Sequence, residues 1–196
     1  MFTGIITHTG KIKKKTKETL FIEAPEDLYK KLTPGMSVAV NGICLTVTAL
    51  KAPSLFSINF MPETAKKTNI QYIIEGDLLN LELPVSIDTL FAGHIVQGHV
   101  DDVSKILNIE DEGNSRIFTF IIDPKISKYM VDKGSVAVNG ISLTIIQAFH
   151  DRFTVGIIPH TWDHTMLHTS KVGDFVNIEV DVLAKYLEKL VVHNKE

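Results

Sequence analysis

An internal duplication constrains the fold of this chain more than any other feature. The ten residues SVAVNGICLT at Ser37–Thr46 return as SVAVNGISLT at Ser135–Thr144, with nine of the ten letters unchanged. The stretch EGDLLNLEL at 75–83 returns as VGDFVNIEV at 172–180. The repeating unit that these matches define is far longer than the ~20–50 residues of solenoid repeats. The sequence therefore predicts one domain written twice, over residues 1–87 and 88–181.

Within each copy the pattern is that of β-structure. SVAVNGICLTVTAL alternates polar and apolar residues around an Asn-Gly pair, which is typical of a hairpin turn. FSINFM, LLNLEL, IFTFII and RFTVGII are short runs rich in β-branched or aromatic residues. Turn signals arrive about every 8–12 residues, as in small barrels and sandwiches. An all-β fold is expected, with brief helices over APEDLYKKL and DPKISKYMVDK and a turn or two in ETAKKTNI and HTWDHTML.

The tail over residues 182–196 has a different pattern and no counterpart in the first copy. Its apolar residues recur with helical spacing, at Leu183, Tyr186, Leu187, Leu190 and Val191. The tail is predicted to be a helix with one apolar stripe. Self-association and packing against its own barrel are both open as ways to bury that stripe.

Composition excludes several classes of partner. The net charge of −3 leaves no basic surplus for a nucleic-acid backbone. No apolar run approaches the ~18 residues of a membrane span, and the first residues do not form a secretory leader. A single cysteine cannot form an internal disulfide, which agrees with a reducing compartment, so the cytoplasm is the expected location. Phosphate-loop, dinucleotide, zinc-protease and serine-hydrolase motifs are missing from the sequence.

Positions at which the two copies disagree are the first candidates for chemistry. Residues shared by both copies serve the fold, whereas unlike residues can give two similar pockets different roles; neutral drift is the alternative. Five pairs differ in this way: Cys44 and Ser142, Ile5 and His99, Glu63 and His160, Gly35 and Lys133, and Pro84 and Asp181. Cys44 could equally be a small buried hydrophobe, and Asp181 a helix N-cap.

Histidine spacing raises the question of a metal site. On a strand, His94 and His99 would point to opposite faces and could not share a metal. His160, His164 and His168 would share one face of a helix, and two such histidines can hold zinc. No cysteine or carboxylate cluster completes the set, so an incidental stripe is favoured and no metal is expected. A metal-binding module stays open as a third reading.

Seven motifs in order along the chain resemble the riboflavin synthase family of the alpha-chain type. They are MFTGII, VNGICLTV, MPET, GHIVQGHVD, VNGISLTI, IPHT and VNIEVDVLAKYLEKL. The resemblance implies two tandem six-stranded Greek-key barrels and a homotrimer built with the C-terminal helix. It implies that two molecules of 6,7-dimethyl-8-ribityllumazine exchange a four-carbon unit, giving riboflavin and 5-amino-6-(ribitylamino)uracil, without a cofactor or metal. A working site would lie between the N-terminal barrel of one subunit and the C-terminal barrel of its neighbour. Association with lumazine synthase is left open.

The resemblance also implies site residues, carried over by position. Catalytic candidates are Cys44, His99, Lys133, Ser142 and Asp181. Cys44, or a water that it positions, would supply or support the nucleophile, and His99 or Ser142 would help to move a proton from the acidic C7 methyl. Repeat logic groups the N-terminal pocket as Phe2, Gly4, Ile5, Ile6, Leu45, Thr46, Asn59, Phe60, Met61, Pro62, Glu63 and Thr64, with Phe2 covering the site. It groups the C-terminal pocket as Gly98, Val100, Leu143, Thr144, Gly156, Ile157, Ile158, Pro159, His160 and Thr161. Neighbouring-subunit contacts could mix the two sets.

Three departures from the family pattern lie around the end of the first copy and the linker. Thr7 stands where the family often has Glu, Leu83-Pro84 where many members have Arg-Ala, and Ala92 where Gly is common. They bear on the geometry of the joint between the copies. The rival hypothesis is a lumazine-binding antenna protein of the same ancestry that does no chemistry. Intact second-copy motifs, with His99, Lys133 and Asp181 present, favour the enzyme.

Overall fold

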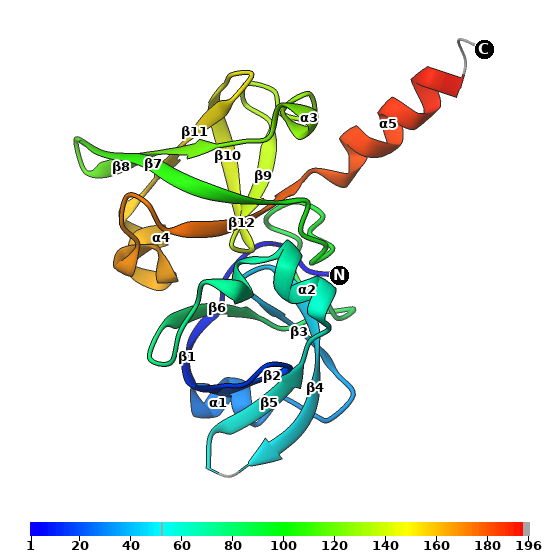
Figure 1. Ribbon diagram of the computed structural model, residues 1–196, viewed down its shortest axis with the longest axis vertical. Coiled ribbons are helices and arrows are strands. Elements are labelled where there is room, and N and C mark those ends of the chain that lie inside the picture. The colour runs from blue at the N-terminus through cyan, green and yellow to red at the C-terminus, as the bar shows by residue number, and fades with distance from the viewer. Residues whose placement is uncertain (52, 194–196) are drawn as a thin grey trace.

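The computed structural model describes residues 1–51 and 53–193, and it contains two closed antiparallel barrels that lie one above the other (Figure 1). The strands of the first barrel follow the spatial order β1-β2-β5-β4-β3-β6, which closes because β6 pairs with β1. This order is a Greek key. The strands are β1 (His8–Lys15), β2 (Thr19–Glu23), β3 (Ser37–Val40), β4 (Ile43–Lys51), β5 (Leu55–Asn59) and β6 (Leu78–Glu82).

The second barrel repeats the first strand for strand. Its order is β7-β8-β11-β10-β9-β12, with β12 paired to β7, so the predicted duplication of a six-stranded Greek-key barrel is confirmed. Both repeated decamers form the expected hairpins across their Asn-Gly turns. The strands are β7 (Asp102–Glu112), β8 (Ser115–Ile121), β9 (Ser135–Val138), β10 (Ile141–Ala148), β11 (Arg152–Ile157) and β12 (Phe175–Val180).

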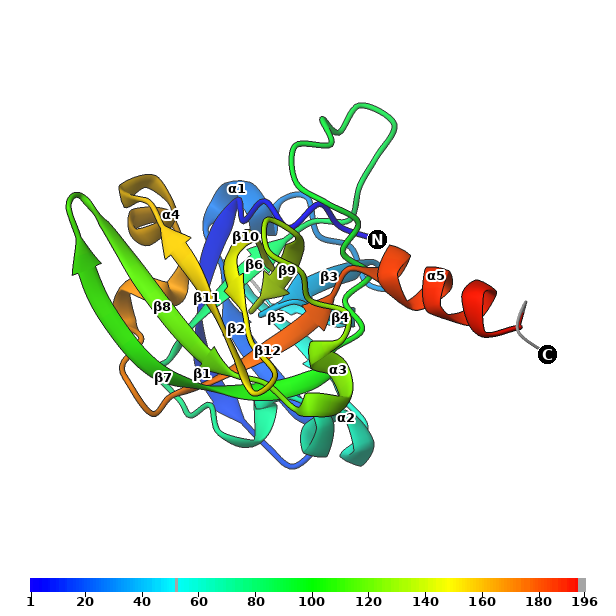
Figure 2. The ribbon, with the colours of Figure 1, turned by 90° about the horizontal axis from the view of Figure 1, so that it is seen from above.

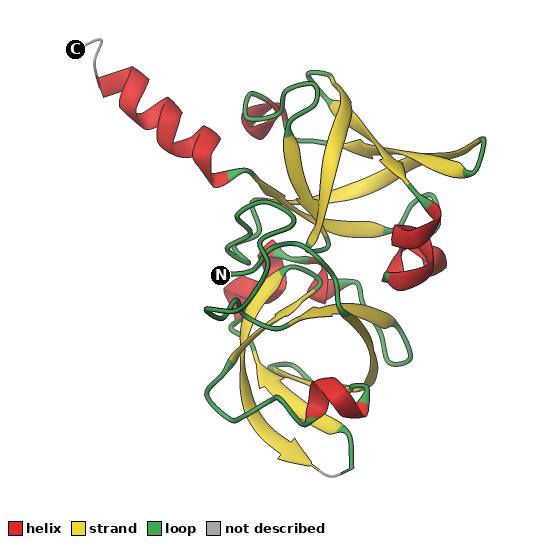
Figure 3. Ribbon diagram, turned by 180° about the vertical axis from the view of Figure 1, so that it is seen from behind, coloured by secondary structure: helices red, strands yellow, loops and turns green. Residues whose placement is uncertain are grey.

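Short helices lie between the strands at matching places in the two barrels, and they are shorter than their sequence patterns suggest (Figure 3). Pro62 and Pro159 each stand at the start of a helix, where a missing backbone N–H costs nothing. The helices are α1 (Glu26–Tyr29), α2 (Pro62–Lys67), α3 (Pro124–Ser127), α4 (Pro159–His164) and α5 (Val182–His193), with 3₁₀ turns η1 (Asn69–Gln71) and η2 (Met166–Thr169).

Each barrel has its own core of inward-facing aliphatic and aromatic side chains, as the alternating strands require. In the first barrel Leu20, Phe56 and Leu79 are fully buried, and in the second Phe118 and Phe153 are fully buried. The buried residues of the two barrels form two separate hydrophobic clusters.

The joint between the barrels is tight and polar. A Cβ built on Gly42 would lie 2.5 Å from the backbone nitrogen of Gly140, so the two Asn-Gly turns touch backbone to backbone. Around this point the Asn177 side chain donates to the carbonyl of Asn41, at 2.8 Å, and to the side chain of Asn69, at 2.9 Å. Because buried amides bond only in fixed geometry, this network sets how one barrel sits on the other.

The tail forms helix α5 over Val182–His193, as predicted, while the last three residues of the predicted span lie outside the described residues; the helix projects away from both barrels (Figures 1 and 2). Its apolar stripe is not packed on its own barrel, since Leu183, Tyr186, Leu187, Leu190 and Val191 are each 54–64% exposed. Among the helices of residues 1–51 and 53–193, none is long and apolar enough to cross a membrane.

Candidate functional site

The segment before the first barrel lies on the second barrel. The backbone N–H of Ser142 in β10 donates to the carbonyl of Gly4 at 2.8 Å. A Cβ on Gly4 would lie 2.6 Å from the Cβ of Ser142, and Gly4 has a positive φ of 78°. Only glycine combines this backbone conformation with so close an approach. Ile6 packs against the core of the second barrel, so this segment lies on the barrel that carries Ser142.

The linker before the second barrel makes the matching contact on the first barrel. The backbone N–H of Cys44 in β4 donates to the carbonyl of Gly98 at 2.9 Å. A Cβ on Gly98 would lie 2.5 Å from the Cβ of Cys44, and Gly98 has a φ of 83°. Val100 packs against the core of the first barrel.

The two contacts cross, which corrects the grouping that repeat logic predicted. Gly4, Ile5 and Ile6 lie with Ser142 on the second barrel, and the segment from Gly98 to Val100 lies with Cys44 on the first. The prediction was wrong because the two barrels are alike. The segment that precedes one barrel can therefore pack on the other barrel with the same local contacts.

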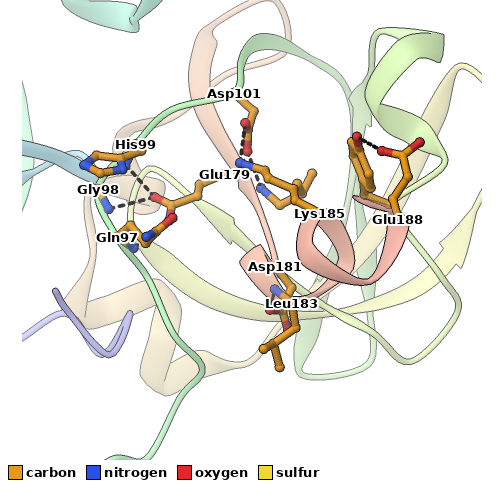
Figure 4. A network of polar contacts seen from close by, with 11 residues as sticks. Gln97, Gly98, His99, Asp101, Glu179, Asp181, Leu183, Lys185 and Glu188 are labelled. Atoms are coloured by element: carbon orange, nitrogen blue, oxygen red, sulfur yellow. Dashed lines mark hydrogen bonds and ion pairs between the residues drawn. The ribbon is translucent and has the colours of Figure 1, made fainter. Parts of the chain in front are cut away.

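A buried carboxylate holds each crossed segment in place, and sequence reasoning missed both. Glu82, at the end of β6, accepts hydrogen bonds from the backbone N–H and hydroxyl of Thr3, at 2.7 and 2.8 Å, and from the N–H of Gly4 at 3.1 Å. Glu179, in β12, accepts from the N–H groups of Gln97, Gly98 and His99 at 2.6, 2.9 and 3.0 Å (Figure 4).

Burial raises the pKa of both carboxyl groups above the usual value of 4.5, although the donated hydrogen bonds oppose the shift. A signal was present in the sequence. Glu82 and Glu179 occupy the same position in both copies, within strands whose only other polar residues are Asn80 and Asn177.

The strands that carry Cys44 and Ser142 present alternate side chains to the crossed segments. Cys44 and Ser142 are half-buried, and Thr46 and Thr144, two residues on, are exposed. Between them, Leu45 and Leu143 point into the barrel cores and are buried. The leucine side chains therefore serve packing, and the prediction that these two residues contribute to ligand binding now concerns their backbone.

The predicted segments at the ends of β5 and β11 lie at the surface in both barrels, but two of their side chains point inward. Phe60 and Ile157 belong to the cores. The backbone carbonyls of Thr64 and Thr161 each accept a hydrogen bond, at 2.7 Å, from the threonine four residues later. The remaining side chains are exposed or half-buried, at Asn59, Met61, Pro62, Glu63, Gly156, Ile158, Pro159 and His160.

Phe2, which was expected to cover the site from the N-terminus, is fully buried between the barrels. It forms a small cluster with Ala39, Val96 and Ala137, against which Cys44 packs. Its backbone pairs with Val96, with N–H to carbonyl distances of 2.7 and 3.2 Å. This backbone pairing joins the two crossed segments to each other. Burial of the phenylalanine ring adds free energy to the contact, because a large aromatic side chain leaves water.

Ser142 has a buried histidine partner that the search for copy differences overlooked. The Nδ1 atom of His94 lies 2.7 Å from Oγ of Ser142. Burial lowers the pKa of His94, and the charge of Asp181 partly opposes this shift. Cys44 has no side-chain hydrogen bond within the part of the chain that the structure describes.

The other catalytic candidates are His99, in the segment that crosses to the first barrel, and Lys133 and Asp181 of the second copy. His99 is exposed, while its backbone N–H is held by Glu179. Asp181 caps α5, because its carboxylate accepts from the N–H of Leu183 at 3.0 Å (Figure 4). Lys133 is exposed and has a φ of 64°, where the first copy has Gly35. Within residues 1–51 and 53–193, no side-chain hydrogen bond joins these three residues to Cys44 or Ser142.

Helix α5 is tied to the crossed linker through Asp101, which follows His99 and Val100. One oxygen of Asp101 accepts from the N–H of Val180 at 3.0 Å, and the other pairs with the ammonium group of Lys185 at 2.5 Å (Figure 4). Glu188 accepts hydrogen bonds from the hydroxyl of Tyr129 and the ammonium group of Lys128. The helix therefore has a defined direction although its apolar stripe is exposed.

The three histidines with helical spacing do not share one helix face. Helix α4 ends at His164, and His168 lies in the following 3₁₀ turn, because Thr165 is extended, with φ −128° and ψ 165°. His160 and His164 stack, with ring centroids 4.3 Å apart. Nδ1 of His164 and of His168 each contact a backbone carbonyl, at 2.8 and 2.6 Å. Over the described residues, no three metal-ligating side chains converge.

Comparison with known proteins accounts for this architecture. The lumazine binding domain family matches the chain twice, over residues 3–84 and 97–181. The riboflavin synthase of Bacillus amyloliquefaciens is 40% identical over 97% of this chain and 90% of its own length. That of Schizosaccharomyces pombe is 41% identical, over 97% and 94%. The chain belongs to the riboflavin synthase family.

Solved structures of LumP share this fold. LumP complexed with 6,7-dimethyl-8-(1'-D-ribityl) lumazine superposes with a TM-score of 0.82 and 22% identity, over 92% of this chain and 99% of that one. LumP complexed with riboflavin gives a TM-score of 0.84 at 23% identity, with the same coverage. At this identity the likeness establishes the arrangement of two barrels.

Proposed function

We propose that this chain is a riboflavin synthase, a transferase that converts two molecules of 6,7-dimethyl-8-ribityllumazine into riboflavin and 5-amino-6-(ribitylamino)uracil. The observation that carries the proposal is the pair of crossed segments, which contact the two barrels alike but meet Cys44 on one and Ser142 on the other. Full-length similarity to several riboflavin synthases supports it. Two like pockets suit two identical substrates, and their unlike residues give donor and acceptor different surroundings.

One lumazine would bind at each crossed segment. On the first barrel the surface comprises Cys44, Thr46, the exposed residues from Asn59 to Thr64 and the Gly98–Val100 segment. On the second it comprises Ser142, Thr144, the exposed residues from Gly156 to Thr161 and the Gly4–Ile6 segment. Exposed backbone along the crossed segments and the two threonine hydroxyls would bind the polar edges of each ring.

Four side chains would act on the ligands. Cys44, or a water that it positions, would supply the nucleophile to one lumazine, and His99 would move the proton of the C7 methyl of the other. Lys133 would contact ligand, and its positive φ supports this role, because strained backbone is kept where a side chain has a task. Asp181 would orient the site from the start of α5. The two products together contain the atoms of two substrates, so the reaction balances without an external oxidant or reductant.

The enzyme would work as a homotrimer assembled through the exposed stripe of α5, with pockets of neighbouring chains facing each other. The stripe supports this, because five apolar side chains on one helix face stay in water in a single chain. Sedimentation equilibrium tests it: Leu187→Lys should give monomers, whereas Lys189→Glu, at an exposed polar position of the same helix, should not. Monomeric wild-type protein at micromolar concentration would contradict it. With its single free thiol, the enzyme would reside in the reducing cytoplasm.

The activity is tested by incubating the pure chain with 6,7-dimethyl-8-ribityllumazine without oxygen or cofactors and following riboflavin by chromatography. One riboflavin formed for every two lumazines consumed is the expected result. Binding of lumazine with no riboflavin formed would instead identify an antenna-type carrier. Adding lumazine synthase to the same sample before gel filtration tests for an association between the two proteins.

A further inference from the structure

Cys44 and Ser142 occupy matching positions in the two barrels. Within the described residues, only the side chain of Ser142 hydrogen-bonds a titratable group, which is the imidazole of His94. Nδ1 of His94 lies 2.7 Å from Oγ of Ser142, which is a normal hydrogen-bond distance. The N–H of His94 donates to the carbonyl of Thr3 at 3.1 Å, so the crossed N-terminal segment fixes its backbone.

The imidazole of His94 is closed off from water on its other side. The residue is 8% exposed, and its Nε2 atom is buried with no hydrogen-bond partner in the described part of the chain. The ring is therefore held by one hydrogen bond at Nδ1 and has an unpaired nitrogen at Nε2.

This environment selects one protonation form of the ring. A charged imidazolium would bury a second donor without a partner, and burial lowers the pKa of His94, so the ring is neutral. Of the two neutral forms, the one with its proton on Nε2 would leave a buried N–H unpaired. The form with its proton on Nδ1 leaves only a lone pair unpaired, and orphaned buried donors are the rarer case.

We propose that His94 is a positioning residue whose Nδ1–H donates to Oγ of Ser142, so that the Ser142 hydroxyl directs its own proton to a bound ligand. Ser142 then acts as an oriented hydrogen-bond donor and not as a nucleophile, because its oxygen already accepts from His94 and has no base to take its proton. The ligand part rests on the proposed function. The acceptor on the ligand is a ring nitrogen or carbonyl oxygen of the lumazine on the second barrel.

Cys44 differs from Ser142 in this respect. Within the described residues no imidazole hydrogen-bonds the Cys44 side chain, whereas His94 hydrogen-bonds that of Ser142. The two barrels therefore differ in two ways: one has Cys44 where the other has Ser142, and only Ser142 is an oriented hydroxyl donor.

Nitrogen NMR on the unmodified chain tests the first half of the proposal. Two-bond proton–nitrogen correlations of ¹⁵N-histidine-labelled protein show which ring nitrogen is protonated, and the spectrum of His94→Asn assigns the signal of His94 among the eight histidines. A protonated Nδ1 is the expected result. A protonated Nε2 would overturn the proposal, since Ser142 would then donate to His94. This readout needs no ligand, so it stands apart from the proposed function.

Binding of a non-reacting ligand tests the second half. The probe is the 7-oxo analogue of the lumazine, which lacks the acidic methyl group, titrated by calorimetry. His94→Leu should weaken binding at one site about tenfold, as for the loss of one hydrogen bond, whereas His94→Asn, whose amide can still donate, should stay within about threefold. In Ser142→Ala the His94→Leu change should add nothing. An equal loss with and without Ser142 would show a merely structural role and overturn the proposal.

If no variant or wild-type chain binds the analogue, the proposed function fails, and with it the ligand half of the proposal. The NMR result on His94 and Ser142 would still decide the direction of their hydrogen bond. Circular dichroism melts of each variant, compared with wild type, show whether a binding loss comes from unfolding.

Discussion

Replacing Gly98 by alanine perturbs the crossed contact at its closest point. The added Cβ would lie 2.5 Å from the Cβ of Cys44 and 2.6 Å from its backbone nitrogen, both below any real carbon contact. The linker must therefore retreat from β4. It then loses the hydrogen bond from the N–H of Cys44 to the carbonyl of Gly98, now 2.9 Å, and its φ of 83° becomes strained for alanine.

The magnitude follows from these two effects. A left-handed backbone costs an alanine about 1–2 kcal/mol, and the lost hydrogen bond costs about 1 kcal/mol. Together about 2–3 kcal/mol favours the detached linker, which raises the population of that state between about 30-fold and 150-fold. Both barrel cores and the contacts of the N-terminal segment with Glu82 and Ser142 are unaffected, so the variant should stay folded.

Cys44 reports the outcome, because it is the single cysteine of the chain and lies under Gly98. We expect Gly98→Ala to accelerate modification of the thiol by a maleimide by at least about tenfold. Gly4→Ala is the matched control: its Cβ would meet Ser142 at 2.6 Å, so the thiol rate should stay near that of wild type. If Gly4→Ala exposed the thiol and Gly98→Ala did not, the segments would pair within their own copies and the crossed arrangement would be refuted.

Three further predictions concern strain, charge and the joint. Lys133→Gly should relieve the φ of 64° and raise the melting temperature by about 2 °C while lowering riboflavin formation, as calorimetry and the turnover assay would show. In wild type, the raised pKa of Glu179 makes the folded state bind more protons than the unfolded state, so the free energy of unfolding falls as the pH rises from 4.5 through that pKa. Denaturant titrations across this pH range should show a smaller fall for Glu179→Gln. The same pH dependence in the variant and the wild type would contradict the prediction. Asn177→Ala removes two side-chain donors between the barrels and should cost about 2 kcal/mol in urea unfolding; a loss below about 0.5 kcal/mol would show that the network does not hold the joint.

Local patterns predicted the elements of this fold well. Alternation and the Asn-Gly pairs located both hairpins, and the spacing from Leu183 to Val191 located α5. These features depend on neighbours within a few residues, which the sequence states directly. The duplication then gave the second barrel from the first.

The sequence could not show which segment meets which barrel, because that contact joins residues far apart along the chain. Exchanging Gly4 and Gly98 between two similar barrels preserves every local preference. Glu82 and Glu179 were hidden for a related reason, since residues common to both copies were assigned to the fold without a partner. His94 was hidden for another reason: its partner Ser142 is 48 residues away along the chain, and His94 was weighed only as a metal ligand together with His99.

The most direct test of two unlike pockets on one chain is to count bound ligand. Calorimetric titration with the 7-oxo analogue of the lumazine should give two sites per chain with different affinities, because one contains Cys44 and the other Ser142 oriented by His94. Gly98→Ala should weaken one site and Gly4→Ala the other. A single site per chain, or two sites of equal affinity that both variants weaken alike, would contradict this.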